Sequence, residues 1–257
     1  MSRNTKRLVL TLGSLCVLAG VSALAPAAFR HVDAFRVQEV ELAGARFLSP
    51  DEVVATAGIT DSSNVFDDAL NWNRALEEHA LVAGVRLERR PPHTLRFHVL
   101  EATPVALVSV PELVPVDASG RVLPIETAGI LLDLPVIGRR ARIDADSIVD
   151  EVTKTLVAGL VRIQTLDARM AANISEITTA GGGGIRILLD RGDAVEVLLP
   201  NEPDARGLME VRLALDHLES DAPANAEIND RNDSRSVRID ARYRDELFVT
   251  LQPKRTS

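Results

Sequence analysis

The sequence of 257 residues has few aromatic side chains, one cysteine and no excess of positive charge. Aromatic residues make up only 3%, so the bases of single-stranded nucleic acid would find few stacking partners. The formal net charge of -8 also disfavours binding to phosphate backbones, which attract basic surfaces. The single cysteine, Cys16, excludes an intrachain disulfide, and five scattered histidines form no metal-ligand motif. These scarcities predict no nucleic acid partner, no cofactor and no metal.

Catalytic motifs are missing as well. The sequence contains no G-x-S-x-G, H-E-x-x-H or H-x-x-E-H pattern. Paired acids such as Asp67-Asp68 and Glu77-Glu78 are typical of helix starts and of exposed helix faces. We therefore expect a protein that is not an enzyme. The remaining enzymatic alternative, a cell-wall enzyme, predicts hydrolysis or transfer on purified peptidoglycan.

One long uncharged run lies near the N-terminus. It extends from Leu8 through Cys16 to Phe29 and, as a helix, would be roughly 33 Å long, which matches the thickness of a bilayer core. Arg3, Lys6 and Arg7 precede it and form the positive flank that stays in the cytoplasm. The pattern predicts a cytoplasmic tail at 1–7, a transmembrane helix at 8–29 and the bulk of the chain outside the cytoplasm.

A cleaved signal peptide is the alternative for the same segment. Ala23, Ala25 and Ala27 offer A-x-A cleavage sites. The uncharged run is longer than the usual apolar region of a signal peptide, which has about 7 to 15 residues, and Pro26 would follow directly after a cut at Ala25. Both observations favour the anchor.

Residues 33–102 show the order strand, helix, helix, strand, strand. Apolar residues alternate with polar ones between 35 and 42, and Ser49-Pro50-Asp51-Glu52 is a capping-box helix start. Helical spacing predicts a second helix at about 68–79. Two alternating strands follow, separated by a turn at Pro91-Pro92. This order predicts helices layered on a small sheet.

The module resembles a POTRA domain of the FtsQ family of bacterial division proteins, which is also called DivIB. The strings FRVQEVELAGARFLSPDEVVATAGI, NVFD and RALEEHALVAGVRLERRPPHTLRFHVLEATPVA carry the resemblance. Ala80 departs from it, because the family usually has proline there. Arg86, Arg89 and Arg90 concentrate positive charge in this module. We interpret them as part of a solvated sheet face, and a recruitment patch for an acidic partner or membrane headgroups is the alternative.

Residues 103–252 are rich in short apolar runs. VDASGRVLPI and LPVIGRR stand where the family's β domain has a D-x-x-G turn and an LP-x-x-G segment. Asp146-Ser147 is expected to cap an amphipathic helix that ends near Thr165, and a second helix is expected at 203–218. The glycines at 181–184 predict a hairpin turn, because a strand follows them and a phosphate-binding loop needs a helix there.

The predicted fold class is α+β. It comprises a single transmembrane helix, a POTRA domain of β-α-α-β-β order and a mostly antiparallel β domain with two flanking helices, ending in a tail at 253–257.

The last strands are the candidate partner site. The string SVRIDARY and the apolar run after it resemble the family's terminal I/V-D-L-R-Y segment, with Ala241 in place of leucine. In that family, the last strands present an edge to which FtsB and FtsL bind by strand addition. An edge strand offers unpaired backbone groups for affinity and alternating side chains for specificity. The expected partner-binding residues are Arg242, Tyr243, Leu247, Phe248, Val249 and Leu251.

Strand periodicity predicts how these side chains divide between the two faces. If no bulge intervenes, Tyr243 shares a face with Leu247, Val249 and Leu251, whereas Arg242 and Phe248 share the other face. The alternative interpretation of the two leading residues is that Tyr243 belongs to the core and Arg242 to a surface ion pair.

The resemblance implies a non-enzymatic scaffold of the bacterial cytoplasmic membrane at the division septum. Such a scaffold links FtsB-like and FtsL-like partners to septal peptidoglycan synthesis, while its POTRA and transmembrane segments contact other division proteins. The alternative is a POTRA-bearing component of a protein transport or secretion system.

Overall fold

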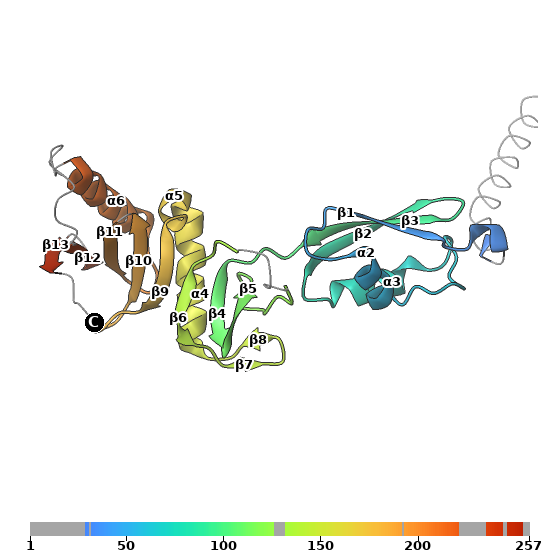
Figure 1. Ribbon diagram of the computed structural model, residues 1–257, viewed down its shortest axis with the longest axis horizontal. Helices are drawn as coiled ribbons and strands as arrows, with labels where there is room; N and C mark the ends of the chain where they lie inside the picture. The colour runs from blue at the N-terminus through green and yellow to red at the C-terminus, as the bar shows by residue number, and fades with distance from the viewer. Residues whose placement is uncertain are drawn as a thin grey trace, which may run out of the picture. The chain divides into compact units, whose positions relative to one another are not determined.

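The computed structural model describes residues 29–30, 32–125, 132–191, 193–220, 235–243 and 246–253. They form two compact units, one ending at Ala102 and the other beginning at Thr103 (Figure 1). Within the described ranges, no helix is both long and apolar enough to cross a membrane. The transmembrane segment expected at 8–29, including Leu8 and Cys16, lies outside the described residues except for Phe29 and stays a prediction.

The first unit is a three-stranded sheet with two helices on one face. Its elements are η1 (Asp33–Phe35), β1 (Glu39–Ala43), α2 (Pro50–Ala57), α3 (Ala69–Glu77), β2 (Val82–Arg90) and β3 (Thr94–Glu101). β3 lies in the middle of the sheet, parallel to β1 and antiparallel to β2. The β-α-α-β-β order predicted from the sequence is confirmed.

Local chemistry explains where α2 begins and ends. The Ser49 hydroxyl accepts a hydrogen bond from the Glu52 amide, and the Glu52 carboxylate accepts one from the Ser49 amide. This capping box satisfies two amides that the first turn leaves without helical partners. Gly58 ends the helix with a φ of 71°, in the left-handed region where glycine has no Cβ to clash. Val53 of α2 and Leu76 of α3 then lie buried against the sheet.

The second unit contains one eight-stranded sheet with the order β13-β12-β11-β10-β9-β6-β4-β5. Its elements are β4 (Ala106–Val110), β5 (Glu112–Val116), β6 (Val136–Arg140), β7 (Ile143–Asp144), β8 (Ser147–Ile148), α4 (Glu151–Leu166), α5 (Ala168–Ala171), β9 (Ile174–Thr179), β10 (Ile185–Arg191), β11 (Asp193–Leu199), α6 (Ala205–Ser220), β12 (Arg235–Tyr243) and β13 (Glu246–Pro253). The pairs β4–β6, β6–β9 and β11–β12 are parallel. The sheet is therefore more mixed than the mostly antiparallel one predicted.

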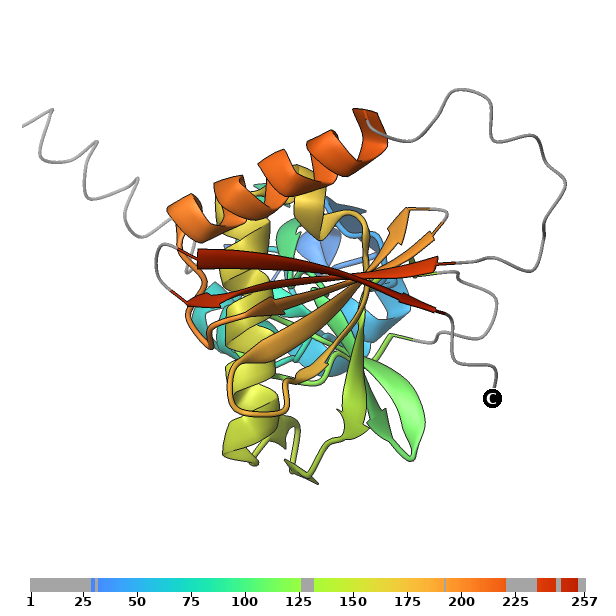
Figure 2. The same cartoon turned by 90° about the vertical axis from the view of Figure 1, so that its left-hand side faces the viewer.

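Two helices pack on this sheet and share one core with it (Figure 2). Leu156 and Leu160 of α4 lie buried with Leu208 and Val211 of α6 against the strands. Both helices lie in connections between parallel strands, because such strands cannot be joined by a tight hairpin. α6 is the connection that brings the chain from β11 to β12.

The predicted start of α4 is wrong by several residues. Ser147 belongs to the short strand β8, and the helix is capped by Asp150 instead. The buried Asp150 carboxylate accepts hydrogen bonds from the Thr153 amide and the Thr153 hydroxyl, at 3.0 and 2.7 Å. Asp146-Ser147 has the composition of a cap, but the β7–β8 hairpin pairs Ser147 with Asp144.

Candidate partner-binding site

The sheet of the second unit has two edges, and the β5 edge is covered at its C-terminal end. Pro115 has no amide hydrogen to offer a partner strand. Its carbonyl accepts a hydrogen bond of 2.9 Å from the Leu123 amide, because the turn at Asp117 to Gly120 folds the chain back beside β5. A short strand with a proline and a covering segment is a poor template for strand addition.

The β13 edge is longer and more open. Among the described strands its only neighbour is β12, with which it pairs in antiparallel fashion from Arg235–Pro253 to Tyr243–Glu246. The inner side of this hairpin belongs to the core: Ile239 is fully buried, and Leu247 packs against the core cluster. One side of β13 therefore pairs with a well-packed strand, β12. The backbone groups on its other side face outward (Figure 2).

The hairpin contains an irregularity that changes the predicted division of side chains. The register between β12 and β13 shifts between Asp240 and Tyr243, so β12 has an extra residue there. The Tyr243 ring consequently lies edge-on to Phe248, with centroids 6.2 Å apart. The assumption of no bulge is wrong, and Tyr243 joins Phe248 instead of the face of Leu247 and Val249.

The shared aromatic surface is exposed. Tyr243 has 56% and Phe248 51% of its surface accessible, and Val249 is exposed on the other side of the strand. Tyr243 therefore is not a core residue. Leu251 pairs with Val237 of β12 in the register of the two strands. An edge with large exposed side chains on both sides can offer a partner strand backbone hydrogen bonds and apolar contacts at once.

Arg242 is held by its own domain. Its guanidinium forms an ion pair of 2.6 Å with Asp240 and donates hydrogen bonds to the carbonyls of Gly181 and Gly183, at 2.7 and 3.1 Å. It also lies 5.7 Å from the centre of the Tyr243 ring. Arg242 thus connects the terminal hairpin to the glycine turn between β9 and β10, as well as to the exposed tyrosine.

The glycine turn is suited to this contact. Gly184 has a φ of 90°, and a Cβ there would lie 2.3 Å from the Leu199 carbonyl oxygen and 3.2 Å from the Arg242 side chain. Only glycine fits such a position without displacing the backbone. The prediction of a hairpin turn is confirmed. The sequence carried no sign that Arg242 would donate hydrogen bonds to this turn, because the two are about 60 positions apart.

Asp240 supplies the negative charge that balances Arg242. The hydrogen bond from Arg242 lowers the pKa of the Asp240 carboxyl, and burial opposes this shift more weakly. Next to this pair, Glu196 lies between Arg186 and Arg238 at 3.4 and 2.8 Å. These ion pairs, together with Phe248, line a hollow of about 540 Å³ on the sheet face. The exposed aromatic surface therefore borders a face whose charges are largely compensated.

Comparison with known proteins covers both units. The family model described as "POTRA domain, FtsQ-type" matches residues 35–102, and that described as "Cell division protein FtsQ/DivIB, C-terminal" matches 106–242, more than half of the chain. The chain belongs to the FtsQ/DivIB family of cell division proteins. The family's C-terminal match ends at Arg242, so the edge strand β13 (Glu246–Pro253) lies just beyond the matched region.

Three relatives, all named "Cell division protein FtsQ", are similar to this chain. The protein of Myxococcus fulvus is 29% identical over 236 residues, covering 84% of this chain and 81% of that protein. The Corynebacterium glutamicum protein is 26% identical over 196 residues, covering 76% and 83%. The Syntrophotalea carbinolica protein is 26% identical over 173 residues, covering 66% of this chain but only 60% of the relative. None of these FtsQ relatives carries a name that points to secretion.

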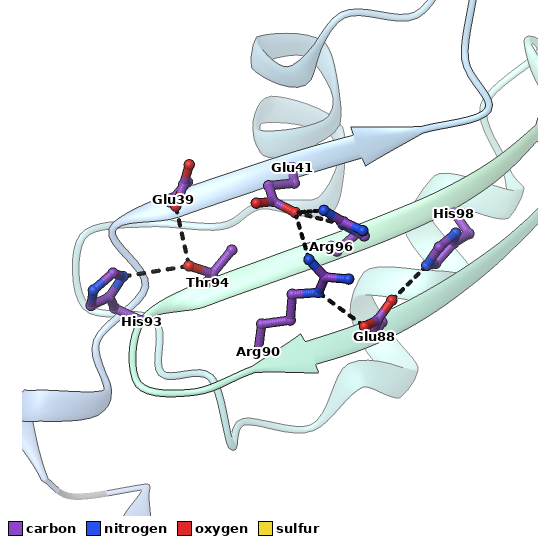
Figure 3. A network of polar contacts seen from close by, with 8 residues as sticks. All are labelled: Glu39, Glu41, Glu88, Arg90, His93, Thr94, Arg96 and His98. Atoms are coloured by element: carbon purple, nitrogen blue, oxygen red, sulfur yellow. Dashed lines mark hydrogen bonds and ion pairs between the residues drawn. The ribbon is translucent and has the colours of Figure 1, made fainter.

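The basic residues predicted for the first unit of this FtsQ-family chain do not form one basic surface. Arg90 lies on the open sheet face, where it pairs with Glu88 at 2.9 Å and with Glu41 at 3.5 Å (Figure 3). Glu88 also contacts His98 at 2.8 Å, and the hydrogen bonds from His98 and then Arg90 lower the pKa of Glu88 to about 2. Positive charge on this face is therefore interleaved with carboxylates.

Arg89 and Arg86 differ from Arg90 in their surroundings. Arg89 donates hydrogen bonds to the carbonyls of Val65 and Asp67, at 2.8 and 2.9 Å, and so fastens a loop of its own domain. Arg86 is exposed on the face that carries His98, its partner in the β2–β3 register. Alternation along β2 places Arg89 on the opposite face from the other two. The solvated-face interpretation fits Arg86 and Arg90, whereas Arg89 has a structural contact.

Proposed function

We propose that the chain is a non-enzymatic scaffold of the division machinery, anchored by a single transmembrane helix at 8–29 with its N-terminus in the cytoplasm. Its first domain, at 33–102, and its second domain, at 103–252, lie outside the cytoplasmic membrane at the septum. The second domain binds FtsB-like and FtsL-like partners at β13 and thereby links them to septal peptidoglycan synthesis. The first domain and the membrane segment recruit other division proteins.

The observation that carries this proposal is the contrast between the covered β5 edge and the open β13 edge. An incoming strand would pair with the outward backbone groups of β13 and place alternate side chains beside Tyr243 and Phe248, or beside Val249. Tyrosine contributes large contact area at little entropic cost, and aromatic residues are frequent interface anchors. Membership of the FtsQ/DivIB family supports the choice of division proteins as the partners.

The test is binding of the full chain, in detergent or nanodiscs, to co-expressed FtsB-like and FtsL-like proteins from the same genome. Tyr243→Glu places a charge on the exposed edge and is expected to weaken binding at least about 30-fold, as for an interface anchor worth about 2 kcal/mol. Leu113→Glu is the matched control, because Leu113 is an exposed apolar residue (46%) on the opposite edge strand β5.

The two variants separate the proposal from its failure. Loss of the partners with Tyr243→Glu, while Leu113→Glu and the wild type retain them, supports β13 as the docking edge. If Tyr243→Glu stays folded by circular dichroism and retains both partners, strand addition at β13 is wrong. Depletion of the protein in cells should cause filamentation, and normal division after depletion contradicts the division role itself.

A further inference from the structure

The chain enters the first domain through a cluster of three phenylalanines. The ring centroids of Phe29, Phe35 and Phe66 lie 5.1 to 5.4 Å apart, with each ring contacting the other two. These are half of the six phenylalanines in the chain. Phe29 is also the last residue of the uncharged run from Leu8.

Asn64 fastens the backbone of this entry segment. Its side-chain amide donates hydrogen bonds of 3.2 Å to the carbonyls of both Phe29 and Val32, and its side-chain oxygen accepts one from the Phe66 amide. Asn64 is only 3% exposed, so these bonds are shielded from water. The Val65 amide adds a hydrogen bond of 2.9 Å to the Phe35 carbonyl. The segment is thus built into the domain.

The loop that receives the segment is fixed from the other side. Arg89 of β2 holds the carbonyls of Val65 and Asp67. Arg30, the first charge after the uncharged run, donates a hydrogen bond of 2.8 Å to the Phe66 carbonyl. Through these contacts the sheet, the loop and the entry segment form one connected unit, with no stretch of free chain between Val32 and β1.

Phe29 and Val32 nevertheless remain 40% and 41% exposed. We infer that the phenylalanine junction, formed by Phe29, Val32, Phe35 and Phe66, seats the first domain on the lipid surface from which the anchor emerges. This inference depends on the membrane anchor of the proposed function. Exposed aromatic and aliphatic side chains next to an apolar run lie at the depth of lipid headgroups, where apolar bodies enter the acyl boundary.

The charges at the junction favour lipid phosphates in general over strongly anionic lipid in particular. Arg30 is exposed, and its guanidinium carries further donors beside the one bonded to Phe66 that could bind a phosphate. Asp33 and Arg36 form an ion pair with each other at 3.0 Å, so they add little net charge. The apolar contact therefore supplies most of the attraction, and seating should persist in purely zwitterionic phosphatidylcholine.

The test places a spin label at the junction of the full chain in phosphatidylcholine nanodiscs. Cys16→Ser removes the native thiol, and Ala34→Cys adds one at an exposed position within η1. The reference position is Leu100→Cys. It lies six residues beyond Thr94 along β3, so it is roughly 20 Å from the Thr94 end of the sheet. The label at 34 should be shielded from a water-soluble nickel relaxant and lie within about 10 Å of the acyl boundary, whereas the label at 100 should be fully accessible.

Two variants separate the junction from general stability. Phe29→Ser with Val32→Ser removes the exposed apolar surface and should make the label at 34 accessible to nickel. Leu100→Ser removes an even more exposed leucine (68%) from the far end of the sheet and should change nothing. Asn64→Ala should increase the motion of the label, because the entry segment loses two of its backbone restraints.

Each outcome decides between clear alternatives. Flotation of the protein with the nanodiscs while the label at 34 stays in water overturns the seating and leaves the anchor intact. Absence of flotation overturns both the anchor and the seating. Shielding that appears only when a partner protein is added also overturns the inference, because the junction would then be a protein interface.

Discussion

The two edge strands of the second domain's sheet carry similar exposed side chains but differ in whether their outward backbone groups are already bonded. β5 and β13 both carry exposed apolar side chains, with Leu113 on one and Phe248 on the other. On β5 the backbone is closed by Pro115 and by the Leu123 amide, whereas on β13 the ladder stops at a single neighbour among the described strands.

The difference shows that exposed apolar residues do not by themselves mark a docking edge. What distinguishes β13 is the combination of an open backbone edge with a well-packed neighbour, because Ile239 of β12 is buried and Arg242 of β12 binds the glycine turn. Unprotected edges promote unwanted association, so proteins usually cover them unless the edge is used. The predictions that follow test each part of this contrast.

The largest effect on the free energy of unfolding is expected for Ile239, the buried residue of β12 beside the open edge strand. Ile239→Ala should lower the free energy of unfolding by about 3 kcal/mol, because a fully buried side chain leaves a cavity. Phe248→Ala on the same hairpin should change it by less than about 0.5 kcal/mol, because the ring is half exposed. Chemical denaturation followed by circular dichroism compares the two. Equal losses would mean that the aromatic surface serves folding instead of docking.

The next effect concerns the helix that brings the chain to the open edge. Arg212 of α6 forms an ion pair with the buried Asp167 at the start of α5. Burial raises the pKa of Asp167, but the hydrogen bonds from Arg212 and the Met170 amide outweigh it and lower the pKa overall. A lowered pKa means that the carboxylate stabilises the fold at neutral pH, and that this contribution is lost as the pH falls through the folded-state value.

Asp167→Asn should therefore cost about 2 kcal/mol near neutral pH, as for hydrogen bonds to a charged group. The gap in unfolding free energy between wild type and variant should narrow as the pH falls below the ordinary range of an aspartate and the wild-type carboxylate becomes protonated. Glu151→Gln is the control, because the Glu151–Lys154 pair on α4 is exposed. Urea unfolding at several pH values measures both. A gap that is constant with pH would contradict the assigned role of the ionised carboxylate.

A smaller effect is expected at the end of the open edge. Asp240→Asn removes the charge that orients Arg242 and should cost about 1 kcal/mol. Hydrogen exchange at the Gly183 amide should become faster, because Arg242 then holds the turn less firmly. Unchanged hydrogen exchange at the turn, together with unchanged partner binding, would show that the hydrogen bonds from Arg242 to the glycine turn do not depend on Asp240.

The smallest effect concerns the closed edge. Pro115→Thr restores an amide to β5, but the Leu123 amide still occupies the carbonyl of residue 115. The unfolding free energy should change by less than about 1 kcal/mol, and sedimentation should show no new self-association. Self-association of this variant would mean that the proline alone protects the edge.

Several elements were predictable because their signals are local. The capping box of α2 lies within four consecutive residues, and the order of helices and strands in the first domain follows from periodicity and turn residues. The start of α4 was missed because two nearby segments both have cap composition. Only the β7–β8 pairing decides that Ser147 lies in a strand while Asp150 caps the helix.

The candidate site was predictable in place but not in geometry. Arg242 and Tyr243 lie on β12 and residues 247–251 on β13, as expected, yet the bulge between Asp240 and Tyr243 reversed the face on which Tyr243 lies. A bulge depends on the register with the partner strand, which the local pattern does not contain. Two further contacts join segments that are distant along the chain, so the local pattern does not contain them either. They are the hydrogen bonds of Arg242 to the glycine turn and the ring contact of Phe29 with Phe66.

By itself, the sequence determined the family, the two-domain plan, the helix caps and the scarcity of aromatic residues, because these follow from composition and from neighbours along the chain. The tertiary structure decided which edge is open, which arginines are already engaged and where the few aromatic side chains meet. Those outcomes depend on strand order and on contacts between distant segments, and the same side chain has a different role when its neighbours in space change.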